Sequence, residues 1–323
     1  MIYIALPENQ SRRLSFYLAM EEYVARRLPA ADYFFMWCVE PSVIFGRNQL
    51  IENEVNLDFC LKHHIQMYRR KSGGGCVYAD RQNIMFSHVT SDEQVGFTFS
   101  RYMSLIVNVL RRLGVDASGT GRNDVMIGHR KVAGSAFYKI PGRSIIHNTM
   151  LYNTDMINMV GSITPSSAKL LSKGVASVRQ RVALLKDYLT PSIEEFMDFV
   201  RKALCTEERT LTEADVKAIE DLEQEYLSDE FIYGKNPQYT LICRRRIESV
   251  GELEARLEVK NGVIKSANLV GDYFLVGDLD KGLLDKLRGV ELTHEALYRA
   301  LPDRLDDVIM NLMTEDFILL LTD

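Results

Sequence analysis

A basic, glycine-rich segment at residues 68–83, YRRKSGGGCVYADRQN, carries the side chains most suited to chemistry. Two arginines and a lysine (69–71) directly precede three glycines (73–75). A glycine backbone lets amide groups approach a phosphate closely, while the cations offset its charge. The segment lacks a Walker or dinucleotide-binding pattern and leads into strand-forming residues, so any phosphate bound here would be held by a loop between strands. The alternative is a mobile hairpin or a bulged turn.

Lys131 is the notable residue of a second segment, GTGRNDVMIGHRKVAGSA (119–136). Small and apolar residues follow the lysine, so its ammonium is expected in a crowded setting. There a compact charge can face a carbonyl or phosphoryl oxygen on which negative charge develops. Asp124 could hold Lys131 in position or take part in binding a metal–nucleotide complex. The alternative is a pair of polar turns between strands.

Two further segments give weaker signals. SIIHNTML (144–151) places His147 in an apolar strand, where a histidine is more often a hydrogen-bonded core residue than a ligand. KGVASVRQR (173–181) carries alternating positive charges at Lys173, Arg179 and Arg181. Such a stretch is typical of a solvated face, although it could steer a partner protein.

The elements that must position these residues alternate between short strands and amphipathic helices. Ser192 and Glu195 form a capping box, Thr212 opens a charged helix, and Asn261–Gly262 marks a β-hairpin. The pattern predicts an α/β or α+β fold with a mixed sheet. The YGKNP break divides it into a catalytic domain at 1–237 and a small α+β domain at 238–323. Strands are predicted at 1–6, 32–40, 42–45, 65–69, 76–78 and 84–89, helices at 14–28, 50–63 and 99–113, and hairpin strands at 125–152.

Composition limits the classes of function. The 323 residues carry 39 Lys and Arg against 44 Asp and Glu, and the net charge of −5 argues against a general attraction to nucleic acid or to an anionic membrane. No apolar run approaches the roughly 20 residues that span a bilayer, and the N-terminus lacks the order of a signal peptide. Five scattered cysteines without a CxxC pair do not fit a zinc site and indicate a reducing compartment. We therefore expect a cytoplasmic protein without nucleic-acid or membrane partners.

The four segments, in this order, resemble the motifs of the lipoate-protein ligase family. The family pattern RRxSGGGxVxHDxGN appears as RRKSGGGCVYADRQN, and GRNDL…RKxSGSA appears as GRNDV…RKVAGSA. HHGTLL appears as IHNTML, and KGxxSVRxRV as KGVASVRQRV. Beyond the break, YGKNPQY and GDYFLVGDLDKGLLDKLRGV resemble the accessory C-terminal domain of the longer ligases. The resemblance covers nearly the whole chain.

This resemblance implies a fold like that of biotin-ligase catalytic domains and a reaction in two steps. ATP and lipoate give lipoyl-AMP and pyrophosphate, and a lysine of a lipoyl domain then displaces AMP. The implied acceptors are lipoyl-domain proteins, either in 2-oxoacid dehydrogenase complexes or as the glycine-cleavage H protein. Strands around 43–45 and Tyr78 would supply an apolar tunnel for the lipoyl tail.

The resemblance also implies roles for individual residues. Lys131 would be catalytic and would contact both the ATP phosphate and the lipoyl carboxyl, while Asn83 and Asp124 would support the nucleotide, in part through Mg²⁺. The implied nucleotide-binding residues are Arg70, Gly75, Cys76, Val77, Tyr78, Asn83, Asp124 and Lys131. The implied lipoate-binding residues are Lys131, Arg70, Gly74 and His147.

The sequence departs from the family pattern at three places. Ala79-Asp80 replaces HD, Gln82-Asn83 replaces GN, and Asn148 replaces a glycine. The basic and glycine motifs are retained, so adenylation is still expected, while Asn148 is expected to narrow the acyl pocket. Two alternatives remain open: an ATP-independent lipoyl or octanoyl transferase that uses Cys76 as a thioester nucleophile, and a non-catalytic binder of lipoate or lipoyl domains.

Overall fold

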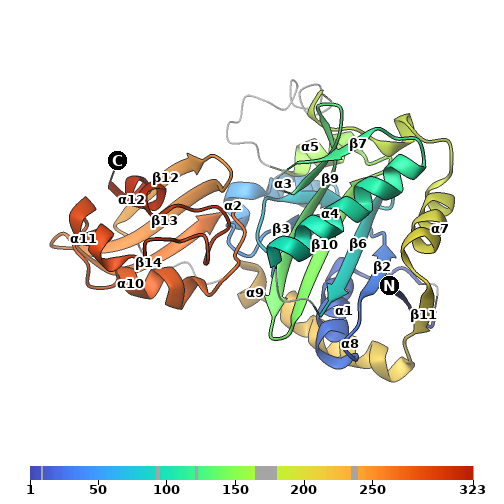
Figure 1. Cartoon of the computed structure of the whole chain (residues 1–323), viewed down its shortest axis with the longest axis horizontal. Coiled ribbons are helices and arrows are strands. Elements are labelled where there is room, and N and C mark those ends of the chain that lie inside the picture. Colours follow the sequence, from blue (N-terminus) through green and yellow to red (C-terminus); the bar gives the residue numbers. More distant parts are fainter. Residues whose placement is uncertain (9, 92–94, 121–122, 164–179, 234–238, 323) are drawn as a thin grey trace. The chain divides into compact units, whose positions relative to one another are not determined.

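The computed structural model describes residues 1–322 except 9, 92–94, 121–122, 164–179 and 234–238 (Figure 1). The chain forms two compact units. The first unit comprises residues 1–45, 51–70 and 76–232, and the second comprises 46–50, 71–75 and the chain from Tyr233 onward. Two short loops from the N-terminal half therefore belong to the second unit, and one of them contains the three glycines.

The first unit contains an eight-stranded mixed sheet with the order β11-β1-β2-β6-β10-β9-β8-β7, and a smaller sheet with the order β4-β3-β5. β1 pairs in parallel with β2 and β11. The remaining neighbours in this sheet, β2–β6, β6–β10, β10–β9, β9–β8 and β8–β7, pair antiparallel. The strands are β1 (Ile2–Ala5), β2 (Tyr33–Trp37), β3 (Ser42–Phe45), β4 (Gln66–Arg69), β5 (Val77–Ala79), β6 (Asn83–Thr90), β7 (Ala117–Gly119), β8 (Asp124–Ile127), β9 (Arg130–Ile140), β10 (Arg143–Leu151) and β11 (Glu207–Thr210). The helices are α1 (Leu14–Arg27), α2 (Ile51–Glu54), α3 (Leu57–Lys62), α4 (Val95–Arg112), α5 (Met156–Ser162), the 3₁₀ turn η1 (Leu185–Asp187), α7 (Ile193–Leu204), α8 (Glu213–Leu227) and α9 (Asp229–Tyr233).

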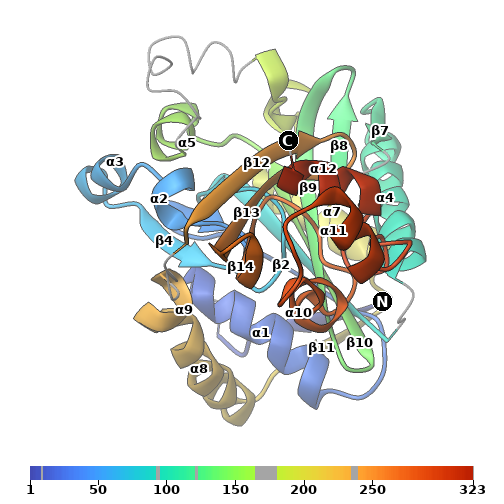
Figure 2. The ribbon, with the colours of Figure 1, turned by 90° about the vertical axis from the view of Figure 1, so that its left-hand side faces the viewer.

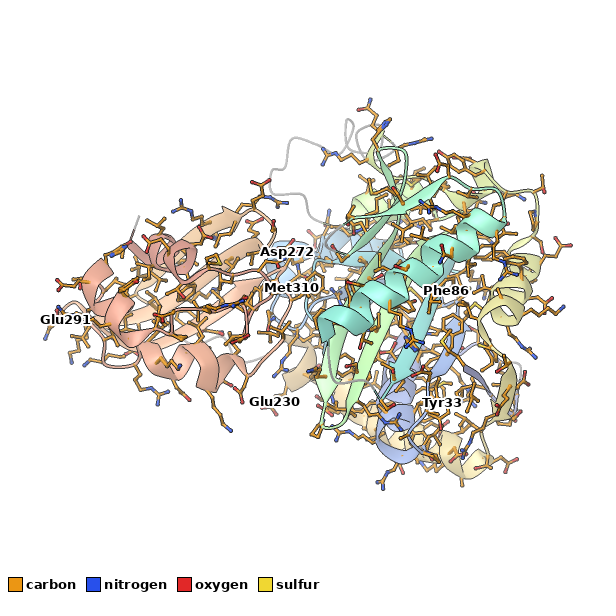
Figure 3. The ribbon with its side chains drawn as sticks, in the orientation of Figure 1. Tyr33, Phe86, Glu230, Asp272, Glu291 and Met310 are labelled. Carbon is orange, nitrogen blue, oxygen red and sulfur yellow. The ribbon has the colours of Figure 1, made fainter. Side chains whose placement is uncertain are left out.

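Helices α1 and α4 cover opposite faces of the large sheet (Figure 2). Helix α1 packs on β6 and β10, with α8 packed against it, and Tyr33 of β2 belongs to the core on this side. On the other side the ring of His88 in β6 stacks on that of Tyr102 in α4. Phe86, also of β6, meets Phe34 edge to face. Side chains fill the space on both faces, as Figure 3 shows around Tyr33 and Phe86. Because successive strand residues point to opposite faces, each residue of β9 and β10 is assigned to the α1 side or the α4 side.

The second unit has a three-stranded antiparallel sheet, β12 (Leu241–Ile247), β13 (Gly251–Lys260) and β14 (Val263–Gly271). Short helices pack on it around a separate apolar core. These helices are the π-helical turn η2 (Asp280–Leu284), α10 (Asp285–Leu287), α11 (His294–Ala300) and α12 (Thr314–Thr322). The two loops from the N-terminal half join this unit through backbone hydrogen bonds, since Gly74 N donates to Tyr273 O at 3.1 Å and Gly271 N donates to Asn48 O at 2.8 Å.

Most of the strands and helices that the sequence predicts are confirmed, including the Asn261–Gly262 hairpin, where both residues have positive φ. The helix predicted at 50–63 is instead two short helices, α2 and α3, and α4 begins before residue 99, at Val95. Strand β11 was not predicted, because its four residues are polar and exposed and its conformation comes from pairing with β1. The pattern of apolar and polar residues in a short stretch of sequence cannot reveal a strand of this kind.

Gly73 is required by close packing within the second unit. A Cβ atom at Gly73 would lie 2.2 Å from the carbonyl oxygen of Tyr273. A Cβ atom at Gly75 would have Cβ of Asp272 as its nearest neighbour, at 3.9 Å. At least one of the three consecutive glycines is therefore explained by backbone packing, without any reference to a phosphate.

We expect Gly73→Ala to lower the free energy of unfolding by about 1–3 kcal/mol, because an added methyl group would force the neighbouring backbone to shift. Gly75→Ala is the matched control, and we expect it to have a clearly smaller effect. Urea unfolding of the full-length chain, with both variants measured side by side, tests this difference. Equal losses in the two variants would contradict the packing explanation.

Candidate active site

A β-bulge orients Lys131 at the start of β9. Val125 of β8 pairs with Ala133, but the next residue, Met126, pairs with Lys131, so Val132 is an extra residue on β9. Such a bulge bends the strand and turns its side chains away from regular alternation. The backbone of Lys131 is also fixed on its other edge, where Ala183 N donates to Lys131 O at 2.7 Å. The lysine is therefore held by two neighbours at an irregular point of the sheet.

The Lys131 ammonium lies over a glycine and beside a carboxylate. Its Nζ is 2.7 Å from Oδ1 of Asp124, and both side chains are partly exposed, at 37% and 29%. Gly134 pairs with Asp124 across the two strands. A Cβ atom at Gly134 would lie 2.7 Å from Nζ and 2.8 Å from Cε of Lys131. The expected proximity of Asp124 and Lys131 is thus present, and a side chain at position 134 would displace the end of the lysine from the place where it lies.

His147 of β10 is part of a buried polar network on the α1 side of the sheet. Its Nδ1 lies 3.0 Å from Oε2 of Glu21, a carboxylate on α1 with no exposed surface. Ser87 donates to Glu21 at 2.6 Å, and Trp37 Nε1 donates to Ser87 Oγ at 2.9 Å. A buried carboxylate is tolerated only when hydrogen bonds compensate its lost hydration. His147 is therefore not an isolated core histidine.

Sequence reasoning missed Glu21, Ser87 and Trp37. They come from three elements, and Glu21 and His147 are 126 residues apart. One signal was available, since Glu21 and the neighbouring Glu22 interrupt the buried apolar side of α1. A charged residue among buried helix positions indicates a partner elsewhere in the fold.

Small residues separate Lys131 from His147 along the α1 face. Gly134 pairs with Thr149 and Ala136 pairs with His147 between β9 and β10. Residues two apart on one strand are about 7 Å apart. A short row of small side chains thus runs from the Lys131 ammonium to the His147–Glu21 pair.

The arginines before the glycine loop are not an exposed cationic cluster. Arg69 donates from Nε to Ile232 O at 2.9 Å, and its guanidinium lies 4.7 Å from the ring centre of Phe45. Arg70 is 4% exposed and donates from Nη1 to Ile44 O at 3.0 Å. Burial lowers the pKa of Arg70 to about 10. Both guanidinium groups thus bind backbone carbonyls of the first unit.

The residues after the loop differ in their surroundings. Gly74 has a φ of 85°, which favours glycine. Desolvation, and then the Glu54 carboxylate, raise the pKa of the Cys76 thiol well above its usual range. Because the thiolate is the nucleophilic form, this environment opposes the thioester route. Tyr78 is buried, and Val77 precedes it in β5.

Asn83 closes the turn between β5 and β6. It is fully buried, and its Nδ2 donates to Tyr78 O at 2.8 Å. Asp80 Oδ1 accepts from Gln82 N at 2.8 Å, and Oδ2 accepts from Asp155 N at 2.9 Å. Of the departures from the family pattern, Ala79 is the last residue of β5 and Gln82 lies in the turn that follows, which keeps its own hydrogen bonds. Asn83 Oδ1 has no hydrogen-bond partner in the described part of the chain.

Two groups of residues that the sequence associates with the acyl pocket lie off the α1 face, at least in part. Asn148 points to the α4 side, where its Nδ2 donates to Ser135 Oγ at 2.8 Å, because it alternates with His147 along β10. It therefore cannot narrow a channel on the α1 face. The side chains of strand β3, around residues 43–45, also point alternately to two different apolar clusters. Val43 and Phe45 pack with Tyr78 in a separate apolar cluster, and Ile44 joins the core under α1.

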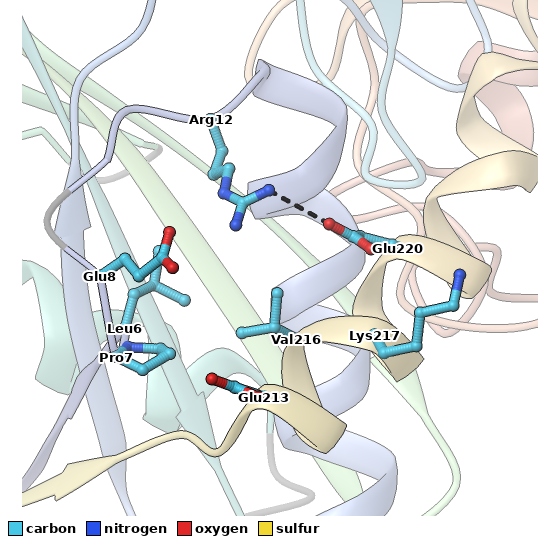
Figure 4. A pocket seen from close by; sticks show the side chains of 8 residues that line it. All are labelled: Leu6, Pro7, Glu8, Arg12, Glu213, Val216, Lys217 and Glu220. Carbon is cyan, nitrogen blue, oxygen red and sulfur yellow. Dashed lines mark hydrogen bonds and ion pairs between the residues drawn. The ribbon is translucent and has the colours of Figure 1, made fainter.

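Other features lie away from these residues or outside the description. A pocket of about 140 Å³ opens between Leu6–Glu8 and α8, where Arg12 pairs with Glu220 (Figure 4). No predicted site residue lines it. Lys173 and Arg179 lie outside the described residues, whereas Arg181 is described and exposed. In the described ranges no group of three potential metal ligands occurs, and no helix is long and apolar enough to cross a membrane.

Comparison with known proteins identifies the family. The model of the lipoyl protein ligase A/B catalytic domain matches residues 14–205, and that of the bacterial lipoate protein ligase C-terminus matches 236–321. Lipoate-protein ligase 1 of Staphylococcus aureus is 38% identical over 292 residues, which cover 87% of this chain and 89% of that protein. Lipoate-protein ligase LplJ of Bacillus subtilis is 32% identical over 302 residues, which cover 86% and 91%.

Solved structures show the same fold. The Plasmodium falciparum protein LipL1 in complex with lipoate aligns with a TM-score of 0.74 at 21% identity and covers 93% of each chain. Lipoate-protein ligase A bound with ATP aligns with a TM-score of 0.62 at 28% identity and covers 72% of this chain and 98% of that one. The predicted fold class is confirmed. With both family models matched in order along most of its length, the chain is a lipoate-protein ligase and belongs to the lipoate-protein ligase family.

Proposed function

We propose that this ligase uses ATP to convert lipoate into lipoyl-AMP and then transfers the lipoyl group to a lysine of a lipoyl domain. One observation carries the proposal: the Lys131 ammonium lies over Gly134, beside Asp124, at one end of a row of small residues that leads to His147. Support also comes from relatives. Solved relatives include one bound with ATP, one with lipoic acid, and one described with its E2 lipoyl domain.

In the first step a carboxylate oxygen of lipoate attacks the α-phosphorus of ATP. A bond from that oxygen to phosphorus forms, the bond from phosphorus to the bridging oxygen breaks, and pyrophosphate leaves. Negative charge develops on the phosphoryl oxygens, and a preorganised ammonium in a partly dehydrated site stabilises it. Lys131 is placed to do this and to hold the carboxylate in position.

In the second step the uncharged amine of the acceptor lysine attacks the carbonyl carbon of the mixed anhydride. The carbon–nitrogen bond forms, the carbon–oxygen bond to AMP breaks so that AMP leaves with the electron pair, and the proton lost by the amine passes to water. The same Lys131 ammonium lies near the departing phosphate in this arrangement. We propose lipoyl domains of 2-oxoacid dehydrogenase complexes, or the glycine-cleavage H protein, as acceptors.

The lipoyl tail is proposed to lie along the α1 face, from the Lys131 ammonium past Ala136 toward His147. The distance of about 7 Å between same-face positions on a strand suits a chain of several methylene groups. The buried Glu21–His147 pair would then lie near the far end of the chain. In this arrangement His147 contacts the lipoyl group, as the family resemblance implies.

The nucleotide contacts are proposed on the resemblance. They comprise Arg70, the backbone from Gly75 to Tyr78, and Asn83. Magnesium usually keeps several waters and binds one or two carboxylates together with substrate phosphates. Asp124 is the partly exposed carboxylate beside Lys131 and fits such a role. A bound magnesium ion would offset the charge of the phosphates.

Pyrophosphate release by the purified protein, with MgATP and without acceptor, tests the function. We expect release only when lipoate is added, because adenylation needs no acceptor protein. Transfer of lipoyl or octanoyl groups between proteins without ATP would instead favour the transferase. Lipoate binding with neither reaction would favour the non-catalytic binder.

Gly134→Ala tests whether the position of the Lys131 side chain over Gly134 matters for the reaction. The added methyl group would displace the ammonium, so we expect lipoate-dependent pyrophosphate release to fall by about 10²-fold, the loss typical of a displacement of about 1 Å. Gly119→Ala in β7 is the control, since its Cβ would have Val107 Cγ2 as nearest neighbour, at 3.9 Å. A Gly134→Ala enzyme as fast as the control would show that the observed lysine position is not used.

A further inference from the structure

Asp124 is held by hydrogen bonds on both sides of its strand. On one side Asp124 N donates to Oγ1 of Thr120 at 3.0 Å, and Thr120 N donates to Asp124 O at 2.8 Å. On the other side Ser135 N donates to Asn123 O at 2.8 Å, and Asn123 Nδ2 donates to Ser135 O at 3.1 Å. Two reciprocal pairs of hydrogen bonds thus surround the first residue of β8.

These hydrogen bonds lie at the end of β8, where its pairing with β9 is irregular. Asp124 begins β8, and the register of β8 with β9 shifts one residue later, between Val125 and Met126. A bulge of this kind disrupts regular pairing. Without additional bonds, the carboxylate that faces Lys131 would be carried by the frayed end of a strand.

Ser135, the β9 residue to which Asn123 is hydrogen-bonded, is itself held in place by its side chain. Ser135 follows Gly134, and its Oγ accepts from Asn148 Nδ2 at 2.8 Å on the buried α4 side. Ser135 Oγ also lies 3.1 Å from Sδ of Met103 in α4. Asn123 therefore binds a backbone position that is tied to the sheet and to a helix. This gives Asn148, one of the departures from the family pattern, a place in the support of the site.

We propose that Asn123 and Thr120 are positioning residues that act through Asp124 to hold the Lys131 ammonium over Gly134. The proposal rests on the proposed function, in which Lys131 contacts the reacting atoms. Asn123 supplies an amide donor to β9, and Thr120, the residue after β7, supplies a hydroxyl acceptor. Their hydrogen bonds are made to backbone groups, so their effect on the lysine passes through the placement of the Asp124 carboxylate.

A double-mutant cycle tests this. Asn123→Ala is expected to slow lipoate-dependent pyrophosphate release by about 10- to 100-fold, the range expected when a reacting group is misplaced by up to about 1 Å. In an Asp124→Ala background the same substitution should change the rate by less than twofold, because the carboxylate that it positions is gone. Thr120→Val, which keeps the side-chain volume and removes the acceptor, should show the same dependence with a smaller loss.

A second readout does not require activity. The rate at which acetic anhydride modifies Lys131, compared by mass spectrometry with exposed Lys186, should rise in Asn123→Ala because the ion pair loosens. In the double variant the rate should equal that of Asp124→Ala alone. An undiminished loss from Asn123→Ala in the Asp124→Ala background, or unchanged Lys131 reactivity in Asn123→Ala, would overturn the proposal. Failure of the proposed function would appear differently, as absence of lipoate-dependent pyrophosphate release in the unmodified enzyme.

Discussion

The contact between the Lys131 ammonium and the Asp124 carboxylate, 2.7 Å apart above a residue without a side chain, is the constraint on which the rest of the site depends. Its contribution to stability is small, because partly exposed ion pairs contribute about 0–1 kcal/mol. Its importance is positional. The bulge at Val132 turns the lysine, Gly134 leaves the volume that the lysine occupies, and Asp124 fixes its charged end. A change in any one of these would move the charge.

Because strand side chains alternate, the two faces of the sheet carry residues of different kinds. On the α1 side, β9 and β10 carry small residues between Lys131 and the buried Glu21–His147 pair, which suits a bound acyl chain. On the α4 side, Ser135 and Asn148 form buried hydrogen bonds that stiffen the same strands. The face proposed to hold the acyl chain therefore lies opposite a face that is closed by packing and polar contacts.

Local sequence patterns predicted much of this architecture. The mixed α/β fold, most strands and the association of Lys131 with Asp124 follow from residues within about a dozen positions of one another. The contacts that the sequence did not predict are non-local. Glu21 reaches His147 from a distant helix, and polar β11 becomes a strand only beside β1. A charge pattern also does not reveal that the guanidinium groups of Arg69 and Arg70 donate to backbone carbonyls.

The most direct test of the central claim is the lipoate-dependent exchange of labelled pyrophosphate into ATP by Lys131→Ala, compared with Lys186→Ala. If the Lys131 ammonium stabilises the charge that develops on the phosphoryl group, its removal should slow exchange by about 10²- to 10³-fold, as the loss of one preorganised electrostatic contact does. Lys186 is exposed and should be replaceable with little effect on the rate. Exchange by Lys131→Ala at the rate of Lys186→Ala would contradict the account.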